Sequence, residues 1–243
     1  TGSATPNHKG VLHSGAGRIA RMRMHTMSLY ESGDSSGQVS LEGLFHENFE
    51  PAKQASASLD HLIALTVRGG WPGSIGLPAR AAAELPRAYI DSILQDDLHR
   101  VDDIKRDLQK VERLLRSLAR NESTVASNAT LRRDMQETDG ETINEDTIAD
   151  YLGLLQRMFL RDDTPAFDPN LRSSVRVGKA VKRHFADPSL AVAALGATAA
   201  MLKKDLNTFG FLFEALGERD LRIYAESFGG KLFHYRDGAG REI

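Results

Sequence analysis

The stretch DDIKRDLQKVERLLRSLAR, residues 102–120, decides the expected fold, and it predicts an amphipathic helix. Its apolar residues recur at spacings of three and four, which places them along one side of a helix: Ile104, Leu108, Val111, Leu115 and Leu118. Shorter helices are expected next, over Ala129 to Glu137 and over Glu145 to Met158, and the chain then becomes extended from Phe159 to Asp162. The sequence therefore predicts three helices followed by a strand.

Such a succession is typical of a winged helix-turn-helix module, which we expect over residues 99–168. The third helix of that module would face DNA, but its outward residues include Glu145, Asp146 and Asp150, whose charges repel phosphate. Arg132 and Arg133, on the preceding helix, have the more suitable charge. The pattern therefore favours protein contact or domain packing over sequence-specific DNA binding.

The composition is that of an ordinary globular protein, with 41% hydrophobic and 26% charged residues among 243. No apolar run approaches the roughly 20 residues of a membrane-spanning helix and no signal peptide is visible, so we expect no membrane partner. The absence of Cys excludes disulfides and thiolate metal sites, and a cytoplasmic location is the simplest expectation. The net charge of −2 argues against extensive coating of nucleic acid, although it is compatible with local basic patches.

Two helices are predicted before the three-helix module. The first, Ser58 to Arg68, ends at Gly69-Gly70, and the Pro72 that follows cannot continue it. The second, Pro78 to Leu94, contains Pro86, which predicts a kink or an early break of the helix.

Other elements are predicted on both sides of these helices. Residues 19–28 alternate in character, with methionines on one face and basic residues on the other, as in an edge strand. After the module we expect three helices and a strand: Ser189 to Gly196, Ala197 to Leu206, Phe209 to Leu216, and the strand Lys231 to Arg236.

No complete catalytic site is visible in the sequence. It contains no Walker-type phosphate loop, no His-Glu metalloprotease motif and no nucleophile-elbow pattern. The strongest basic cluster comprises Arg176, Lys179, Lys182 and Arg183. A solvated protein surface is the ordinary explanation of such a cluster, and contact with nucleic acid is the alternative.

The order of several short motifs resembles the second half of a AAA-type ATPase module. Thr1-Gly2-Ser3 comes first, Gly17-Arg18 precedes a strand, and Gly69-Gly70-Trp71-Pro72 ends a helix. Downstream motifs look like the domain of unknown function that follows many predicted bacterial and archaeal AAA-type ATPases: Leu118-Ala119-Arg120-Asn121, Thr147 with Tyr151-Leu152, Lys179 with Asp187, Phe213-Glu214, Phe233 to Arg236 and Glu242-Ile243.

This resemblance implies roles for particular residues. Thr1 or Ser3 would be the sensor hydroxyl near the γ-phosphate, and Arg18 would be an arginine finger that stabilises the charge developing during phosphoryl transfer. Gly70 and Pro72 would shape the helical lid near the adenine, although a plain helix stop also explains them. The implied ligands are ATP and Mg²⁺, and the phosphate-binding motifs would lie before Thr1 in a longer protein, of which we expect this chain to be an excerpt.

The last part of the chain resembles the start of a restriction-endonuclease-like fold. In that fold carboxylates from a helix and two strands hold Mg²⁺, and Glu214 would be the helical ligand. One carboxylate is not a metal site, so nuclease activity is a hypothesis that depends on residues after Ile243.

We therefore expect a mainly α fold with α/β parts, divided into four units. These are the end of a AAA-type core (1–50), a helical lid (51–98), a winged-helix module (99–168) and a truncated nuclease-like α/β segment (169–243). The expected function is coupling of ATP binding or hydrolysis to the C-terminal part. The expected partner is a nucleic acid or a protein, and the chain could also form a homo-oligomer. A non-enzymatic winged-helix regulator that binds DNA or protein is the alternative.

Overall fold

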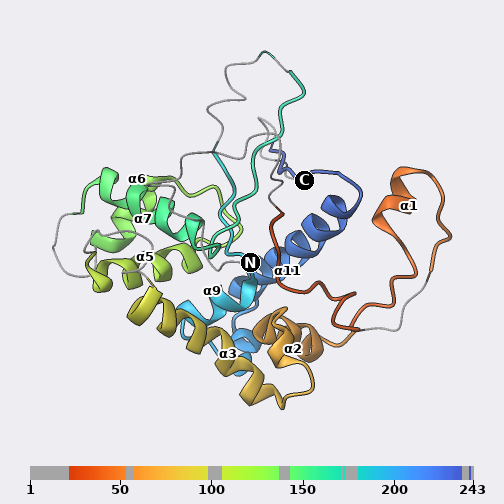
Figure 1. The fold of residues 1–243 in the computed structure, drawn as a ribbon, viewed down its shortest axis with the longest axis horizontal. Coiled ribbons are helices and arrows are strands. Elements are labelled where there is room, and N and C mark those ends of the chain that lie inside the picture. Colours follow the sequence, from red (N-terminus) through yellow and green to blue (C-terminus); the bar gives the residue numbers. More distant parts are fainter. Residues whose placement is uncertain are drawn as a thin grey trace, which may run out of the picture.

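The computed structural model describes residues 22–52, 57–97, 106–136, 143–170, 172, 180–236 and 241. The fold is mainly helical, as predicted, with the long helix α11 running across the molecule beside α2 and α9 (Figure 1). Within these residues the β-structure consists of four isolated bridges, and three of them join residues 182–185 to neighbouring segments. No helix in the described part of the chain is long and apolar enough to cross a membrane.

The three-helix succession is confirmed, with α5 at Leu108–Arg120, α6 at Asn128–Gln136 and α7 at Glu145–Arg157. The first helix was predicted to start at Asp102, which lies outside the described residues; residues 106 and 107, which the prediction included, are not helical. Helix α5 begins at Leu108 because the Asp107 carboxylate caps it, accepting the backbone N–H groups of the first turn.

The helices α2 (Leu59–Arg68) and α3 (Ala79–Ser92) flank the short 3₁₀ turn η1 (Pro72–Ser74). The break predicted at Pro86 does not occur, since α3 runs through it and continues as the π-helical turn η2 (Ile93–Asp97). The Pro86 side chain is buried, on the same face of α3 as Ala82 and Ile90. Packing against the core therefore stabilises the helix at the point where proline interrupts its hydrogen bonding.

Three helices complete the fold: α9 (Pro188–Ala194), α10 (Ala199–Lys204) and α11 (Leu206–Ser227). The predicted short helix Phe209 to Leu216 is therefore part of a 22-residue helix. Helix α9 packs against both α3 and α5, and one hydrophobic cluster includes residues of all these helices and of α2, α6 and α7. The helices at residues 59–92 and at residues 108–157 thus share a core with the C-terminal helices.

Two extended segments differ from the predictions. Residues 231–236 form no strand ladder but isolated bridges: a parallel bridge joins His234 to Ala166, and Arg236 also lies in a bridge. The described part of the predicted edge strand, residues 22–28, is extended without strand pairing. Met22 and Met24 are exposed, while Arg23 and His25 contact the protein. The inner face of this segment is determined by contacts of its basic residues with acidic side chains, which the alternation of apolar and polar residues in the sequence does not predict.

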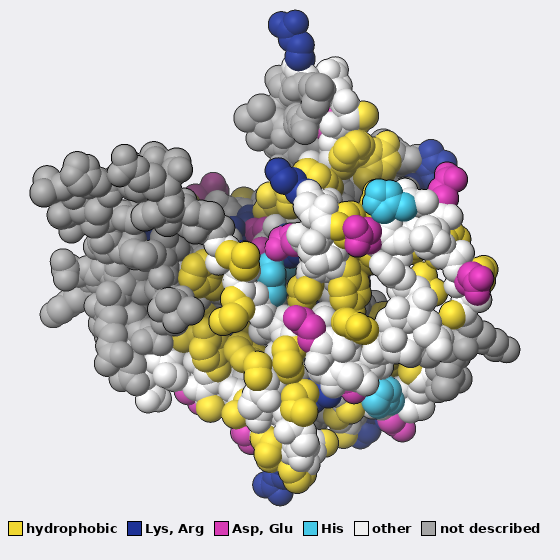
Figure 2. Space-filling view, turned by 45° about the vertical axis from the view of Figure 1, so that its right-hand side comes forward, with side chains coloured by type: hydrophobic (Ala, Val, Ile, Leu, Met, Phe, Trp, Pro, Cys, Tyr) yellow, Lys and Arg dark blue, Asp and Glu magenta, His cyan; other side chains and the backbone are white. Residues whose placement is uncertain are grey.

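The short helix α1 (Leu41–Phe45) has no counterpart among the predicted elements. It lies at the C-terminal end of α11, where the ring of Phe45 packs against that of Phe228 with centroids 5.6 Å apart (Figure 1). Hydrophobic side chains also gather elsewhere on the surface, forming a broad patch in the lower left half of Figure 2.

Candidate functional site

The structure describes some of the predicted site residues. Thr1, Ser3, Arg18, Arg176 and Lys179 lie outside the described residues.

Lys182 and Arg183 are described, and both side chains are buried and paired with carboxylates. The Lys182 ammonium contacts Glu214 and donates to Glu218 Oε1 at 2.8 Å. The Arg183 guanidinium donates to Asp163 Oδ2 at 3.0 Å and also to the Asn128 side chain and a backbone carbonyl. Both charges are compensated inside the protein, which leaves neither side chain available to phosphate in this structure.

Glu214, the predicted metal ligand, forms an ion pair with Lys182. Within the described ranges no group of three His, Asp or Glu side chains is placed to hold a metal ion. Its role as a ligand of Mg²⁺ stays a prediction.

Gly70 and Pro72 lie in the turn between α2 and α3, as predicted. The Gly70 carbonyl accepts the backbone N–H of Met27 at 2.7 Å, and its own N–H donates to Asp187 Oδ2 at 2.9 Å. A Cβ at position 70 would collide with the backbone of Met27. Glycine is therefore required here by the close approach of the N-terminal segment.

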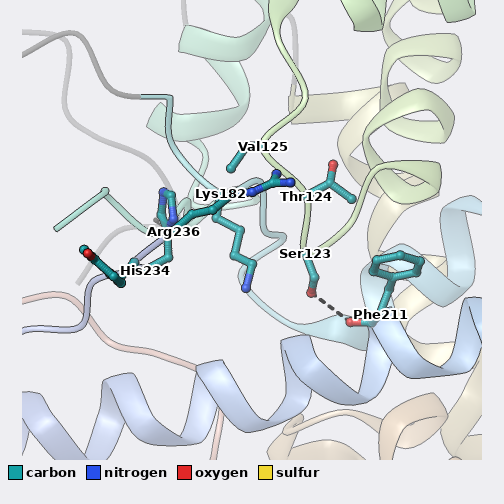
Figure 3. A pocket seen from close by; sticks show the side chains of 8 residues that line it. Ser123, Thr124, Val125, Lys182, Phe211, His234 and Arg236 are labelled. Carbon is teal, nitrogen blue, oxygen red and sulfur yellow. Dashed lines mark hydrogen bonds between the residues drawn. The ribbon is translucent and has the colours of Figure 1, made fainter. Parts of the chain in front are cut away.

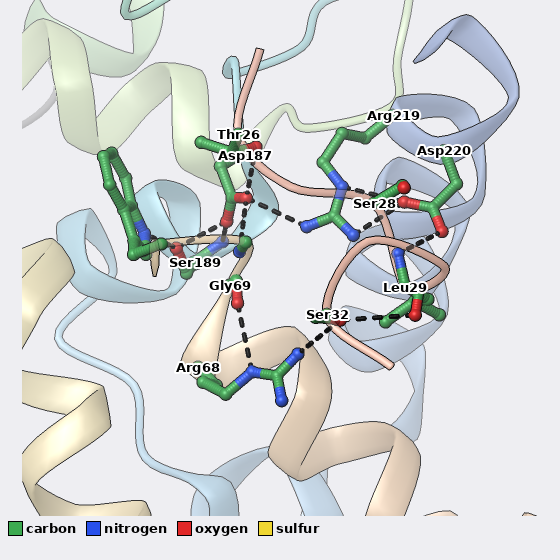
Figure 4. A network of polar contacts seen from close by, with 12 residues as sticks. Thr26, Ser28, Leu29, Ser32, Arg68, Gly69, Asp187, Ser189, Arg219 and Asp220 are labelled. Atoms are coloured by element: carbon green, nitrogen blue, oxygen red, sulfur yellow. Dashed lines mark hydrogen bonds and ion pairs between the residues drawn. The ribbon is translucent and has the colours of Figure 1, made fainter. Parts of the chain in front are cut away.

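Asp187 is the centre of a buried polar network (Figure 4). Its carboxylate is 0% exposed and accepts from the Thr26 hydroxyl, the Gly70 N–H, the Ser189 N–H and the Arg219 guanidinium at 2.8–2.9 Å. Asp187 thus joins the segment before α1, the turn after α2, the start of α9 and the middle of α11.

Arg219 extends this network along α11. Its guanidinium also donates to Asp220 Oδ1, at 2.6 and 3.0 Å, and the other oxygen of Asp220 accepts the backbone N–H of Leu29 at 2.9 Å. We call Asp187, with Thr26, Gly70, Ser189, Arg219 and Asp220, the Asp187 hub.

The electrostatics of the hub favour charged side chains. Burial alone would raise the pKa of Asp187, but the Arg219 charge and the hydrogen bonds from Ser189 and Gly70 outweigh it and hold the pKa below its usual range. Asp187 is therefore an ionised carboxylate in the protein interior, balanced by the guanidinium of α11.

A second buried cluster lies between the turn after α5 and α11. The Nδ1 atom of His184 is 3.0 Å from Glu122 Oε1, and its Nε2 atom is 2.9 Å from Glu218 Oε2, an ion-pair contact without the alignment of a hydrogen bond. Burial opposes the charge of His184, but the two carboxylates raise its pKa to about 9. Burial would raise the pKa of Glu218, but hydrogen bonds and charges of His184 and Lys182 lower it to about 2. His184 is accordingly an imidazolium that links the two glutamates.

A cavity of about 160 Å³ opens beside Lys182 (Figure 3). The Ser123 hydroxyl on its wall donates to the backbone carbonyl of Phe211 at 2.8 Å, and His234 Nε2 lies 3.0 Å from the carbonyl of Ala180. Since the Lys182 charge is already held by Glu214 and Glu218, the ammonium contributes little attraction for an anion in this cavity.

Sequence reasoning identified only part of these clusters. Asp187 carries the signal of a helix cap, and it does cap α9, but that signal says nothing about its contact with Arg219. Thr26 and Glu122 sit in segments with no recognisable motif. The sequence signal that could have suggested the hub is an acid directly before a helix, Asp187, together with an arginine on the apolar side of another helix, Arg219.

No curated protein and no solved structure was found to match this chain. The model of the family described as Domain of unknown function (DUF8612) matches residues 59–200, more than half of the chain. The matched residues run from α2 to the start of α10 and include Gly70 and Asp187 of the hub. The chain therefore belongs to the DUF8612 family.

Proposed function

We propose that this chain is the coupling part of an ATP-binding AAA-type protein, in which the Asp187 hub connects nucleotide-dependent movement of the N-terminal segment to α11. The motif resemblance supports ATP and Mg²⁺ as ligands of the full-length protein. In this proposal Thr1 or Ser3 senses the nucleotide and Arg18 acts on the transferred phosphoryl group, only a few residues before the segment that enters the hub.

The observation that carries the proposal is the position of Asp187 between three parts of the chain. Thr26 reaches it from the expected end of the ATPase core, Gly70 from the expected lid, and Arg219 from the expected nuclease-like part. A single buried carboxylate therefore contacts all three parts.

Burial makes these contacts interdependent. Removing one partner of a buried, hydrogen-bonded ion pair leaves an uncompensated charge, which is strongly unfavourable. If residues 22–35 shift, the hydrogen bonds of Thr26 to Asp187 and of the Leu29 N–H to Asp220 change together. Both carboxylates pair with Arg219, so the shift alters the environment of α11.

The nucleotide part of the proposal is tested on the full-length protein. We expect it to bind and hydrolyse ATP in the presence of Mg²⁺, and we expect Arg18→Ala to lower turnover while nucleotide binding stays nearly intact. Equal loss of binding and turnover would instead assign Arg18 a role in folding. The isolated 243-residue chain should show no turnover, and measurable hydrolysis by it would contradict the proposal.

The coupling part is tested by hydrogen exchange in α11 with and without ATP. Thr26→Val removes one hydrogen bond to Asp187 and keeps the shape of the side chain. We expect the ATP-dependent change in α11 exchange to be lost in this variant, while ATP binding is retained. Thr208→Val is the matched control, since the Thr208 hydroxyl bonds only to Asp205 at an exposed helix cap. If both variants keep the ATP response, the hub does not couple the two regions.

A further inference from the structure

A cavity of about 400 Å³ lies between α2, α3, α9 and the start of α10, and we call it the α2–α9 cavity. It shares no lining residue with the cavity beside Lys182. Helix α2 packs against α3, α9 and α10, and α3 packs against α9, so helices in mutual contact hold its walls in place (Figure 1). Its volume falls within the range of about 300–1,000 Å³ that is typical of sites for small molecules.

Small apolar side chains form most of the lining of the α2–α9 cavity. They are Ala64, Val67, Ala83, Val192, Ala193 and Ala197. The two valines and Ala197 are buried, so the cavity extends from the surface into the edge of the core. Well-packed protein interiors leave few voids larger than a water molecule. A hollow of this size with apolar walls is therefore suited to a ligand with an apolar body.

The hydroxyl groups of the lining already have partners in the protein. The Ser189 hydroxyl donates to Asp187 Oδ1 and accepts the indole N–H of Trp71 at 2.9 Å. The Thr198 hydroxyl accepts the backbone N–H of Met201 and caps α10. A polar ligand body would lose its hydrogen bonds to water on entering the buried part of the cavity without full replacement, which is unfavourable.

Three charged side chains of α3 line the more exposed side of the cavity: Arg80, Glu84 and Arg87. Arg87 donates to Glu84 Oε1 and to the backbone carbonyl of Ala197, both at 3.1 Å, so the charges of Arg87 and Glu84 compensate each other. Arg80 has neither a hydrogen bond nor an ion pair within the described part of the chain. The cavity therefore carries one uncompensated positive charge at its exposed side, and a guanidinium matches the two oxygens of a carboxylate.

We propose that the α2–α9 cavity binds an aliphatic carboxylate, with its chain against the alanine and valine side chains and its carboxylate on Arg80. The apolar walls select the chain, and the uncompensated charge selects the anionic group. Arg80 repels an aliphatic cation, and a neutral alcohol gains only the contacts of its chain. Because Ser189 both lines the cavity and bonds to Asp187, the ligand lies directly against the Asp187 hub.

The class of ligand is tested by isothermal titration calorimetry of the full-length protein with octanoate. We expect saturable binding of one octanoate per chain. Hexanoate should bind roughly tenfold more weakly, because it lacks two methylene groups and each buried methylene contributes about fourfold in affinity. The absence of saturable octanoate binding at millimolar concentrations, or equal affinity for the two acids, would overturn the proposal.

The role of Arg80 is tested by Arg80→Gln, with 1-octanol as the neutral ligand. We expect the variant to bind octanoate about fivefold more weakly, while its affinity for 1-octanol stays within about twofold of the wild type. Arg116→Gln is the matched control, because Arg116 is 67% exposed on α5 and does not line the cavity. It should leave both affinities unchanged. An octanoate affinity that Arg80→Gln does not alter would refute the proposed carboxylate site.

The position of the ligand is tested by filling the cavity from two helices. Ala64→Leu and Ala83→Leu each add a larger side chain to the lining, on α2 and α3 respectively. We expect each variant to bind both octanoate and 1-octanol about tenfold more weakly, because the chain loses its contacts with the walls. Leucine is a good helix former, so both variants should remain folded, with a Tm close to that of the wild type.

Ala81→Leu is the matched control for the filled variants, since Ala81 is exposed on α3 and does not line the cavity. Its affinity for octanoate should stay within about twofold of the wild type. If the filled variants bind octanoate as well as this control does, the ligand lies elsewhere and the proposal fails. The titrations contain no nucleotide, so their outcome is separate from that of the proposed function.

Discussion

Replacing Asp187 with Asn is the sharpest test of the hub as a structural unit. The substitution keeps the size of the side chain but removes its negative charge, so Arg219 remains buried with only Asp220 to balance it. It also places an amide NH₂ where the carboxylate now accepts N–H groups from Gly70 and Ser189. Breaking a buried ion pair in this way costs about 3–5 kcal/mol of folding free energy.

The expected effect is large enough to measure by calorimetry or by urea unfolding. For a protein of this size 1 kcal/mol corresponds to a shift in Tm of about 2–4 °C, so we expect Asp187→Asn to lower the Tm by roughly 6–20 °C. Asp205→Asn is the matched control, because Asp205 caps α11 at the surface and Asn caps helices equally well. A Tm for Asp187→Asn within a few degrees of the control would refute the view that the hub is a tightly balanced network.

Three further predictions concern the other clusters. The pKa of His184 is raised to about 9, so its contribution to stability is complete below its unfolded pKa near 6.5 and is lost as the pH rises through 9; urea unfolding of His184→Gln should lack this decline. Gly70→Ala should lower the free energy of unfolding by more than 1 kcal/mol because its Cβ collides with Met27, whereas Gly153→Ala in α7, where a Cβ meets nothing, should raise it by up to about 1 kcal/mol; equal effects would contradict the close approach at Gly70. If the basic cluster binds DNA, reversing the charges of Arg176 and Lys179 should abolish salt-dependent binding by the full-length protein, and binding unchanged by both reversals would exclude these two residues. Lys182 and Arg183 are poor test sites, because each forms a buried ion pair whose loss would also destabilise the protein.

Much of the helical framework could be predicted from the sequence, since local patterns determine it. The spacing of apolar residues predicted the buried side of α5: Val111, Leu115 and Leu118 are buried as expected, but Leu108 is 36% exposed and Ile104 lies outside the described residues. Glycine and proline at positions 69–72 correctly marked the end of α2. These signals act within one or two turns of the chain.

The errors arose where distant residues decide the structure. Pro86 is a local signal for a break, but its burial against the core maintains α3. The predicted strand at Lys231 to Arg236 has the right alternation but forms isolated bridges, at His234 and Arg236, in place of a ladder. Strand formation needs a partner in register, which a single segment of sequence does not reveal.

The candidate site was harder to predict than the helices for the same reason. Thr26 and Asp187 are separated by 161 residues, and Asp187 and Arg219 by 32. No periodicity or motif spacing connects such positions. Burial of the basic residues Lys182 and Arg183 was also unexpected, because a run of charges is usually solvated, whereas here each charge has its own carboxylate.

The length of sequence between the hub residues has a consequence for synthesis of the protein. The backbone N–H of Leu29 bonds to a side chain 191 residues later, on α11. During translation, at about 5–20 residues per second, residues 22–35 must therefore wait on the order of ten seconds or more for their partners to emerge. Over that interval residues 22–35 and the apolar side of α2 have no α11 to pack against. The newly made chain would then expose surfaces that chaperones bind, and it would complete this part of its fold only after α11 has been made.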